Sequence, residues 1–128
     1  MGFLDRLKSS QATGVPTWKT LSDISQLEQI AKDSEDKAVV IFKHSVTCGI
    51  SAGAKHRLES QWDLVNTDID FYYLDLLSNR AISTDIADRW AVRHQSPQIV
   101  VIRNNEAVYD TSHGSISPGD LESKVAVL

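Results

Sequence analysis

Apolar and polar residues alternate along this chain in blocks that predict helices and strands in turn. The first helical block is capped by Ser22 or Asp23 and ends at the polar stretch 33–37. Its apolar residues recur at the spacing of one helical face, and they are Ile24, Leu27, Ile30 and Ala31. The run 38–42 is continuously apolar and rich in β-branched residues, which is typical of a strand covered on both faces.

The same alternation continues beyond the first strand. A helix is expected to follow Cys48, because apolar residues recur at helical spacing between positions 52 and 65, and the stretch 69–75 predicts a second buried strand. The next helix carries apolar residues at helical spacing, namely Ile82, Ile86, Ala87, Trp90 and Ala91. Trp62 and Trp90 fall on apolar helix faces, so we expect both in the core.

The last third of the chain predicts a hairpin and a closing helix. Residues 98–103 and 106–110 are two predicted strands joined by Asn104–Asn105, and asparagine tolerates the positive φ of a two-residue turn. Ser117 then caps a helix with Pro118 in its first position. Strands separated by helices pair in parallel and strands joined by a tight turn pair antiparallel. We therefore expect an α/β fold with a mixed central sheet flanked by helices.

Composition indicates one ordinary domain. The chain has 128 residues, with 13 lysines and arginines against 17 aspartates and glutamates, a net charge of −4. We expect residues 1–16 to form a flexible N-terminal arm and residues 17–128 to form the folded domain. The mild acidic excess argues against nucleic acid binding, and no apolar run approaches the roughly 18 residues of a membrane span. A cytoplasmic protein that binds neither nucleic acid nor membrane is expected.

Cys48 is the chain's one cysteine, so it acts as a single thiol. It lies where the predicted strand gives way to a helix, and the free backbone N–H groups and dipole of a helix start favour the thiolate. The thiolate is the nucleophilic form of cysteine. Polar neighbours at positions 45, 47, 49 and 51 fit a reactive Cys48 better than the alternative, a buried and inert cysteine.

Ser51 stands where a Cys-x-x-Cys motif has its second sulfur. Its hydroxyl can donate a hydrogen bond to a thiolate but cannot resolve a mixed disulfide. An ordinary polar residue in a first helical turn is an equally simple interpretation. In either case the resolving thiol must come from another molecule.

Pro97 follows Ser96 and precedes a predicted strand. On chemistry alone a trans bond that starts the strand is the commoner state. The histidines are scattered, at positions 44, 56, 94 and 113, and lack the paired spacing of a zinc site, so no metal is expected. A cysteine–histidine hydrolase with His44, His94 or His113 as its base stays open, although no spacing pairs them with Cys48.

Three segments of the chain resemble the monothiol bacilliredoxins of the YtxJ type, which belong to the bacillithiol system. These segments are Ser45–Ser51, the strand end Tyr73–Leu76 followed by Asn79–Arg80, and His94–Gln98. The family motif Thr-Cys-Pro-Ile-Ser is matched at Thr47, Cys48, Ile50 and Ser51. Gly49 replaces the motif's proline and loosens the first helical turn. The resemblance runs from about Trp18 to the C-terminal helix.

The resemblance implies a thioredoxin-like fold in which a cis-Pro loop, here Ser96–Pro97, lies beside the cysteine. It also implies thiol–disulfide exchange on client proteins that carry bacillithiol, with bacillithiol itself as the exchanging small thiol. Residues expected to bind the client or the small thiol are Thr47, Gly49, Ile50, Ser96 and Pro97. Lys43 or Lys55 would meet the carboxylates of bacillithiol.

Two other functions fit the same residues. A monothiol glutaredoxin-like protein would perform the same chemistry with glutathione, since this sequence does not specify the small thiol. A non-catalytic thioredoxin-like binding module would keep Cys48 as a passive residue, and Gly49 gives that alternative some weight.

Overall fold

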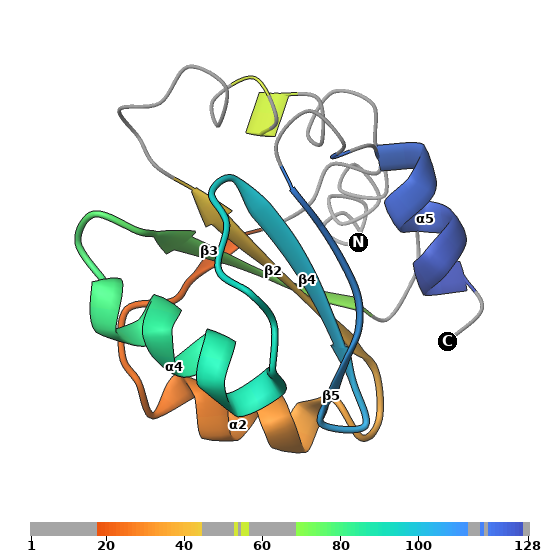
Figure 1. Ribbon diagram of the computed structural model, residues 1–128. Helices are drawn as coiled ribbons and strands as arrows, with labels where there is room; N and C mark the ends of the chain where they lie inside the picture. The colour runs from red at the N-terminus through yellow and green to blue at the C-terminus, as the bar shows by residue number, and fades with distance from the viewer. Residues whose placement is uncertain are drawn as a thin grey trace, which may run out of the picture.

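The computed structural model describes residues 18–44, 53, 55–56, 69–112, 116 and 118–126. Its elements alternate along the chain as the sequence pattern predicts (Figure 1). They are β1 Trp18–Thr20, α2 Gln26–Asp33, β2 Ala38–His44, β3 Ile69–Asp75, α4 Arg80–Trp90, β4 Gln98–Arg103, β5 Glu106–Ser112 and α5 Pro118–Ala126. The expected arm 1–16 and the expected helix with Trp62 lie outside the described residues, apart from the three positions 53, 55 and 56.

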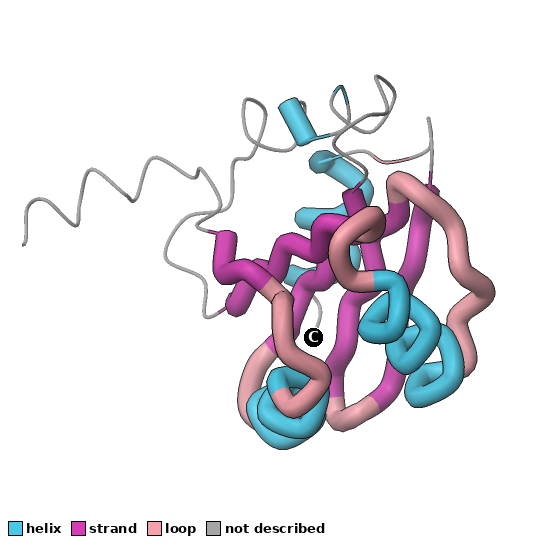
Figure 2. The backbone as a smooth tube through the Cα atoms, turned by 90° about the vertical axis from the view of Figure 1, so that its left-hand side faces the viewer, coloured by secondary structure: helices cyan, strands magenta, loops and turns pink. Residues whose placement is uncertain are grey.

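The five strands form one mixed sheet in the order β1-β3-β2-β4-β5. Strand β3 pairs in parallel with β1 and β2, whereas β4 pairs antiparallel with both β2 and β5. Helices α2 and α4 cover one face of the sheet, and α5 lies on the other (Figures 1 and 2). The predicted α/β fold with a mixed sheet flanked by helices is confirmed.

Two hydrophobic clusters fill the space between the sheet and its helices. Alternate residues of β2 enter opposite clusters, with Val39 and Ile41 on the α2–α4 side and Val40 and Phe42 on the α5 side. All residues of β2 are buried. Trp90, which is 6% exposed, belongs to the α2–α4 cluster, as its helical spacing predicts.

The β4–β5 hairpin has the predicted turn. Asn104 and Asn105 have φ angles of 55° and 58°, so both turn residues lie in the left-handed region that asparagine tolerates. Ala91 also has a positive φ, 56°, and caps the end of α4 instead of extending its apolar face.

The predicted start of the first helix is wrong by a few residues. Helix α2 begins at Gln26 after the N-cap Ser25, and Ile24 is 46% exposed in the preceding turn. The Gln26 side-chain oxygen accepts hydrogen bonds from the backbone N–H groups of Ser22 and Asp23, at 2.8 and 2.9 Å. The Asp23 carboxylate accepts in return from the Ser25 backbone N–H at 2.9 Å, so Asp23 makes the capping contacts that the sequence predicts. These contacts close a turn at residues 24–25, and the regular helix begins after it.

None of the helices in the described ranges combines the length and apolarity needed to cross a bilayer.

Candidate active site

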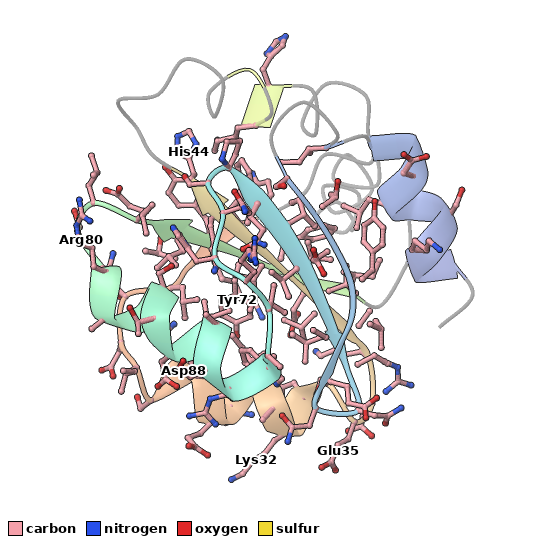
Figure 3. The ribbon with its side chains drawn as sticks, in the orientation of Figure 1. Lys32, Glu35, His44, Tyr72, Arg80 and Asp88 are labelled. Carbon is pink, nitrogen blue, oxygen red and sulfur yellow. The ribbon has the colours of Figure 1, made fainter. Side chains whose placement is uncertain are left out.

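The candidate site lies at the edge of the sheet where β2 ends and β4 begins. Lys43 on β2 pairs with Gln98 on β4, so Pro97, the residue before β4, lies next to the end of β2. Figure 3 labels His44, the last residue of β2, at this edge. Cys48 follows His44 by four positions in the sequence. The edge therefore brings the Pro97 loop beside the strand that leads toward Cys48.

Most residues predicted for the site lie in parts of the chain that the structure does not describe. Thr47, Cys48, Gly49, Ile50 and Ser51 lie outside the described residues, as does the candidate base at position 113. Of the residues predicted as nucleophile, hydrogen-bond partner or thiol-binding group, the structure describes Ser96, which is half-buried, and Pro97, which is buried. It also describes the candidate cations Lys43 and Lys55 and the candidate bases His44 and His94.

The Ser96–Pro97 peptide bond is cis, as the resemblance implies. Gln98, buried at the start of β4, donates a hydrogen bond of 2.9 Å from its side chain to the carbonyl oxygen of Arg93. This bond spans the Pro97 loop and ties its two ends together.

Lys43 lies fully buried beside this loop, because β2 continues two residues beyond the predicted strand end at Phe42. The Lys43 ammonium, Nζ, lies 3.4 Å from Nδ1 of His94. Burial lowers the pKa of Lys43 from its ordinary 10.5 to about 8. Within the described ranges no carboxylate forms an ion pair with Lys43.

His94 receives a second contact at the same ring nitrogen, since Oγ of Ser83 lies 3.0 Å from its Nδ1. An ammonium group has only donors, so the Lys43 contact requires Nδ1 to accept and places the ring proton on Nε2. Burial, and secondly the charge of Lys43, lower the pKa of His94 below its usual 6.5. The His94 imidazole is therefore neutral near pH 7, with one N–H to donate.

His44 projects to the opposite face of the sheet and enters an aromatic cluster with Trp18, Phe42 and Tyr73. Its ring centroid is 5.3 Å from that of Tyr73. Lys55, which follows Cys48 in the sequence, places its Nζ 5.6 Å from the Tyr73 ring centroid and 6.0 Å from the Trp18 ring centroid. A cation thus rests on the aromatic cluster at the end of β2.

A cavity of about 280 Å³ opens beside His94, between the end of β3 and α4. Its lining residues are Leu76, Arg80, Ser83, Thr84, Ala87, Asp88 and His94. Neither Ser83 nor this cavity has a signal in the sequence, because only the folded arrangement brings Ser83 and Lys43 to the same nitrogen of His94. Lys43 reaches His94 because β2 continues beyond Phe42 and pairs with Gln98 of β4.

In the part of the chain that the structure describes, no three histidine, cysteine, aspartate or glutamate side chains are grouped so that they could hold a metal ion.

Comparison with known proteins identifies a matching family and similar solved structures. Residues 19–121 match the family described as monothiol bacilliredoxin BrxC. A solved structure described as a candidate oxidoreductase with a thioredoxin fold is 36% identical, with a TM-score of 0.67, covering 83% of this chain and 91% of its own. The thioredoxin of Trypanosoma brucei brucei, at 20% identity, has a TM-score of 0.69 over 88% of this chain and 91% of its own. The Malassezia sympodialis thioredoxin is similar at 21% identity, with a TM-score of 0.65 over 88% and 90%.

Proposed function

Because the chain belongs to the monothiol bacilliredoxin family BrxC, we propose that it removes bacillithiol from protein mixed disulfides through Cys48. The family match over residues 19–121 is the observation that carries the proposal. The thioredoxin fold and the Pro97 loop beside the end of β2 support thiol–disulfide exchange at this edge of the sheet.

In the first step the Cys48 thiolate attacks the bacillithiol sulfur of the client's mixed disulfide. A new disulfide joins Cys48 to bacillithiol, and the client cysteine leaves as a thiolate. In the second step a bacillithiol thiolate attacks the sulfur of bacillithiol bound to Cys48. The products are bacillithiol disulfide and the Cys48 thiolate. One free bacillithiol is consumed, because its sulfur is oxidised from thiolate to disulfide while the client sulfur is reduced from disulfide to thiolate.

The remaining predicted site residues take supporting roles in this proposal. Thr47, Gly49 and Ile50 flank the nucleophile, and Ser51 donates a hydrogen bond to the thiolate. The Ser96–Pro97 loop offers backbone groups to the client or the small thiol. The partners are bacillithiolated client proteins and free bacillithiol, and the proposed location is the cytoplasm.

Transfer of the small thiol is the decisive measurement. The reduced protein is incubated with one client protein in two forms, bacillithiolated and glutathionylated, and the adduct on Cys48 is identified by intact mass. We expect transfer of bacillithiol. Transfer of glutathione alone would favour a glutaredoxin-like function instead, and no adduct from either client would favour a non-catalytic binding module.

Replacement of Cys48 tests its role as the nucleophile. Cys48→Ser should abolish exchange and leave the circular dichroism spectrum unchanged, because only the sulfur is removed. Ser51→Ala, the control, should keep part of the activity, since it removes one hydrogen bond to the thiolate. Full activity in Cys48→Ser would show the mechanism to be wrong.

A further inference from the structure

The cavity beside His94 is bordered by two positive charges that no described carboxylate neutralises. Lys43 lies behind His94, and Arg80 lines the cavity directly. Neither forms an ion pair within the ranges that the structure describes. A buried ammonium without a counter-ion is unfavourable, so an anion placed nearby would be stabilised by it.

The start of α4 adds to the positive potential at the same end of the cavity. Arg80 is the first residue of this helix, and the first turn contains no acidic residue. The N-cap residue Asn79 makes no side-chain capping bond. Neither an acidic residue of the first turn nor a side-chain cap therefore offsets the positive end of the helix dipole, and the Asp75 carboxylate in the preceding turn is engaged with Leu77 N–H and Ser78 Oγ.

The neutral imidazole of His94 adds a hydrogen-bond donor at this end of the cavity. Nδ1 of His94 faces the donor groups of Lys43 and Ser83, so the ring proton lies on Nε2 and is available for donation. Among the lining residues that the structure describes, Asp88 is the acidic one, and it follows Arg80 by eight positions, about 12 Å along the helix axis. Figure 3 shows Arg80 and Asp88 at separate points along α4. The charge pattern therefore orients a bound anion toward Arg80 and away from Asp88.

We propose that this cavity binds a carboxylate of the small thiol that exchanges at the candidate site, with Arg80 and His94 as its donors and Lys43 as the buried counter-charge. The inference rests on the proposed function, because that function supplies the thiol. A volume of about 280 Å³ is at the small end of ligand sites, so the cavity takes the acidic part of the thiol and not the whole molecule.

Binding of a thioether that cannot exchange isolates the carboxylate contact. The probes are S-methyl bacillithiol and its fully esterified methyl ester, and the Kd of each is measured by calorimetry for wild type, Arg80→Gln and Arg93→Gln. Arg93 is a matched control because it is an exposed arginine next to His94 that does not line the cavity. For the acid, Arg80→Gln should raise the Kd about tenfold or more, as expected for a lost charge-assisted hydrogen bond, and Arg93→Gln should leave it unchanged.

Esterification should weaken binding to the wild type and have little further effect on Arg80→Gln, since both changes remove the same contact. Equal affinity for acid and ester, equal effects of the two arginine variants, or no binding of either probe would overturn the inference. Exchange on the bacillithiolated client, measured in parallel, tests the proposed function separately. A wild type that exchanges normally but binds acid and ester alike would retain the function and lose the carboxylate site.

Discussion

Lys43 combines two properties at the scale of a single residue, because it is fully buried and it contacts the neutral ring of His94. Its folded-state pKa of about 8 lies below the ordinary value of 10.5. Between these two pH values the unfolded chain holds a proton that the folded chain has released. The free energy of unfolding therefore increases with pH across this window, and below about pH 8 the full cost of the buried charge is present.

We predict that the free energy of unfolding rises by about 1–2 kcal/mol between roughly pH 7.5 and 9.5, and that Lys43→Met removes this rise. Urea unfolding at a series of pH values measures the free energy of unfolding. All variants carry Cys48→Ser, so that the thiol does not titrate. Lys32→Met, which replaces an exposed lysine of α2, should follow the wild-type profile. Burial raises the pKa of Tyr72, which acts with the opposite sign above about pH 10, so the scan stops below that pH. A rise that persists in Lys43→Met would assign it to another group.

Local pattern predicts Trp90 correctly and misses Lys43. The tryptophan sits on a helical face with other apolar residues, so the periodicity alone places it in the core. Lysine is almost never fully buried, and the apolar run ends before it. Its burial results from the pairing of β2 with β4, a contact between segments more than fifty residues apart.

Ser34 joins two elements, the end of α2 and the β4–β5 turn. Its backbone oxygen accepts from the Asn104 backbone N–H at 2.6 Å and from the Arg103 guanidinium at 2.7 Å. Its hydroxyl accepts from the Asn105 backbone N–H at 2.8 Å and donates to the Ala31 carbonyl at 2.7 Å. One buried serine therefore fixes the turn against the helix.

We predict that Ser34→Ala lowers the free energy of unfolding by about 1–3 kcal/mol, because the Asn105 N–H loses its acceptor in a partly buried setting. Urea unfolding of the variant measures the loss. Ser22→Ala is the control, since this exposed serine uses only its backbone N–H in the contacts at the start of α2, and the change should stay within about 0.5 kcal/mol. Equal losses in the two variants would contradict the role of the Ser34 hydroxyl.

Elements defined by local signals are the ones that sequence predicts well. The strands 69–75 and 98–103 and the Asn104–Asn105 turn have the predicted bounds, because apolar runs and turn residues define them. The start of α2 differs from the prediction because the capping contacts of Asp23 close a turn at residues 24–25 before the regular helix begins. Ser34 was predicted as part of a polar helix stop, and its buried contacts depend on the distant hairpin.

At the scale of the whole molecule, β2 and β3 lie inside the sheet together with β4, and β1 and β5 form its edges. Every residue of β2 is buried, whereas β5 alternates exposed and half-buried residues along most of its length. Side chains of α2 and α4 share a core cluster with one face of β2, and Leu121 of α5 shares a cluster with the other face. The most protected backbone should therefore lie along β2 and its neighbour β4.

Native-state hydrogen exchange tests this ordering. We predict that amides of Val40, Ile41 and Val101 exchange only through global unfolding, whereas those of Val108 and Asp110 on β5 exchange faster by local opening. The free energies of exchange at the first three should fall together with the global stability in Ser34→Ala. Equal protection of β2 and β5 would show that the edge strand belongs to the same cooperative unit.

The overall arrangement was predictable to the extent that element order limits topology. Alternating strands and helices followed by a hairpin predict a mixed sheet, and the Pro97 loop follows from the position of proline before the hairpin in a thioredoxin-like fold. The cavity was not predictable, since its lining comes from the turn after β3, from α4 and from the loop after α4, and no single segment carries its pattern.

The aromatic cluster at the end of β2 has an optical consequence. Trp18 packs with Phe42 and Tyr73, and the Lys55 ammonium lies 6.0 Å from its indole ring. The emission wavelength of an indole depends on the electric field across it, and a single charge at this distance contributes strongly to that field. With Trp62 and Trp90 replaced by phenylalanine, Trp18 is a built-in fluorophore whose emission wavelength reports the position of Lys55, so movement of this lysine can be followed without an added dye.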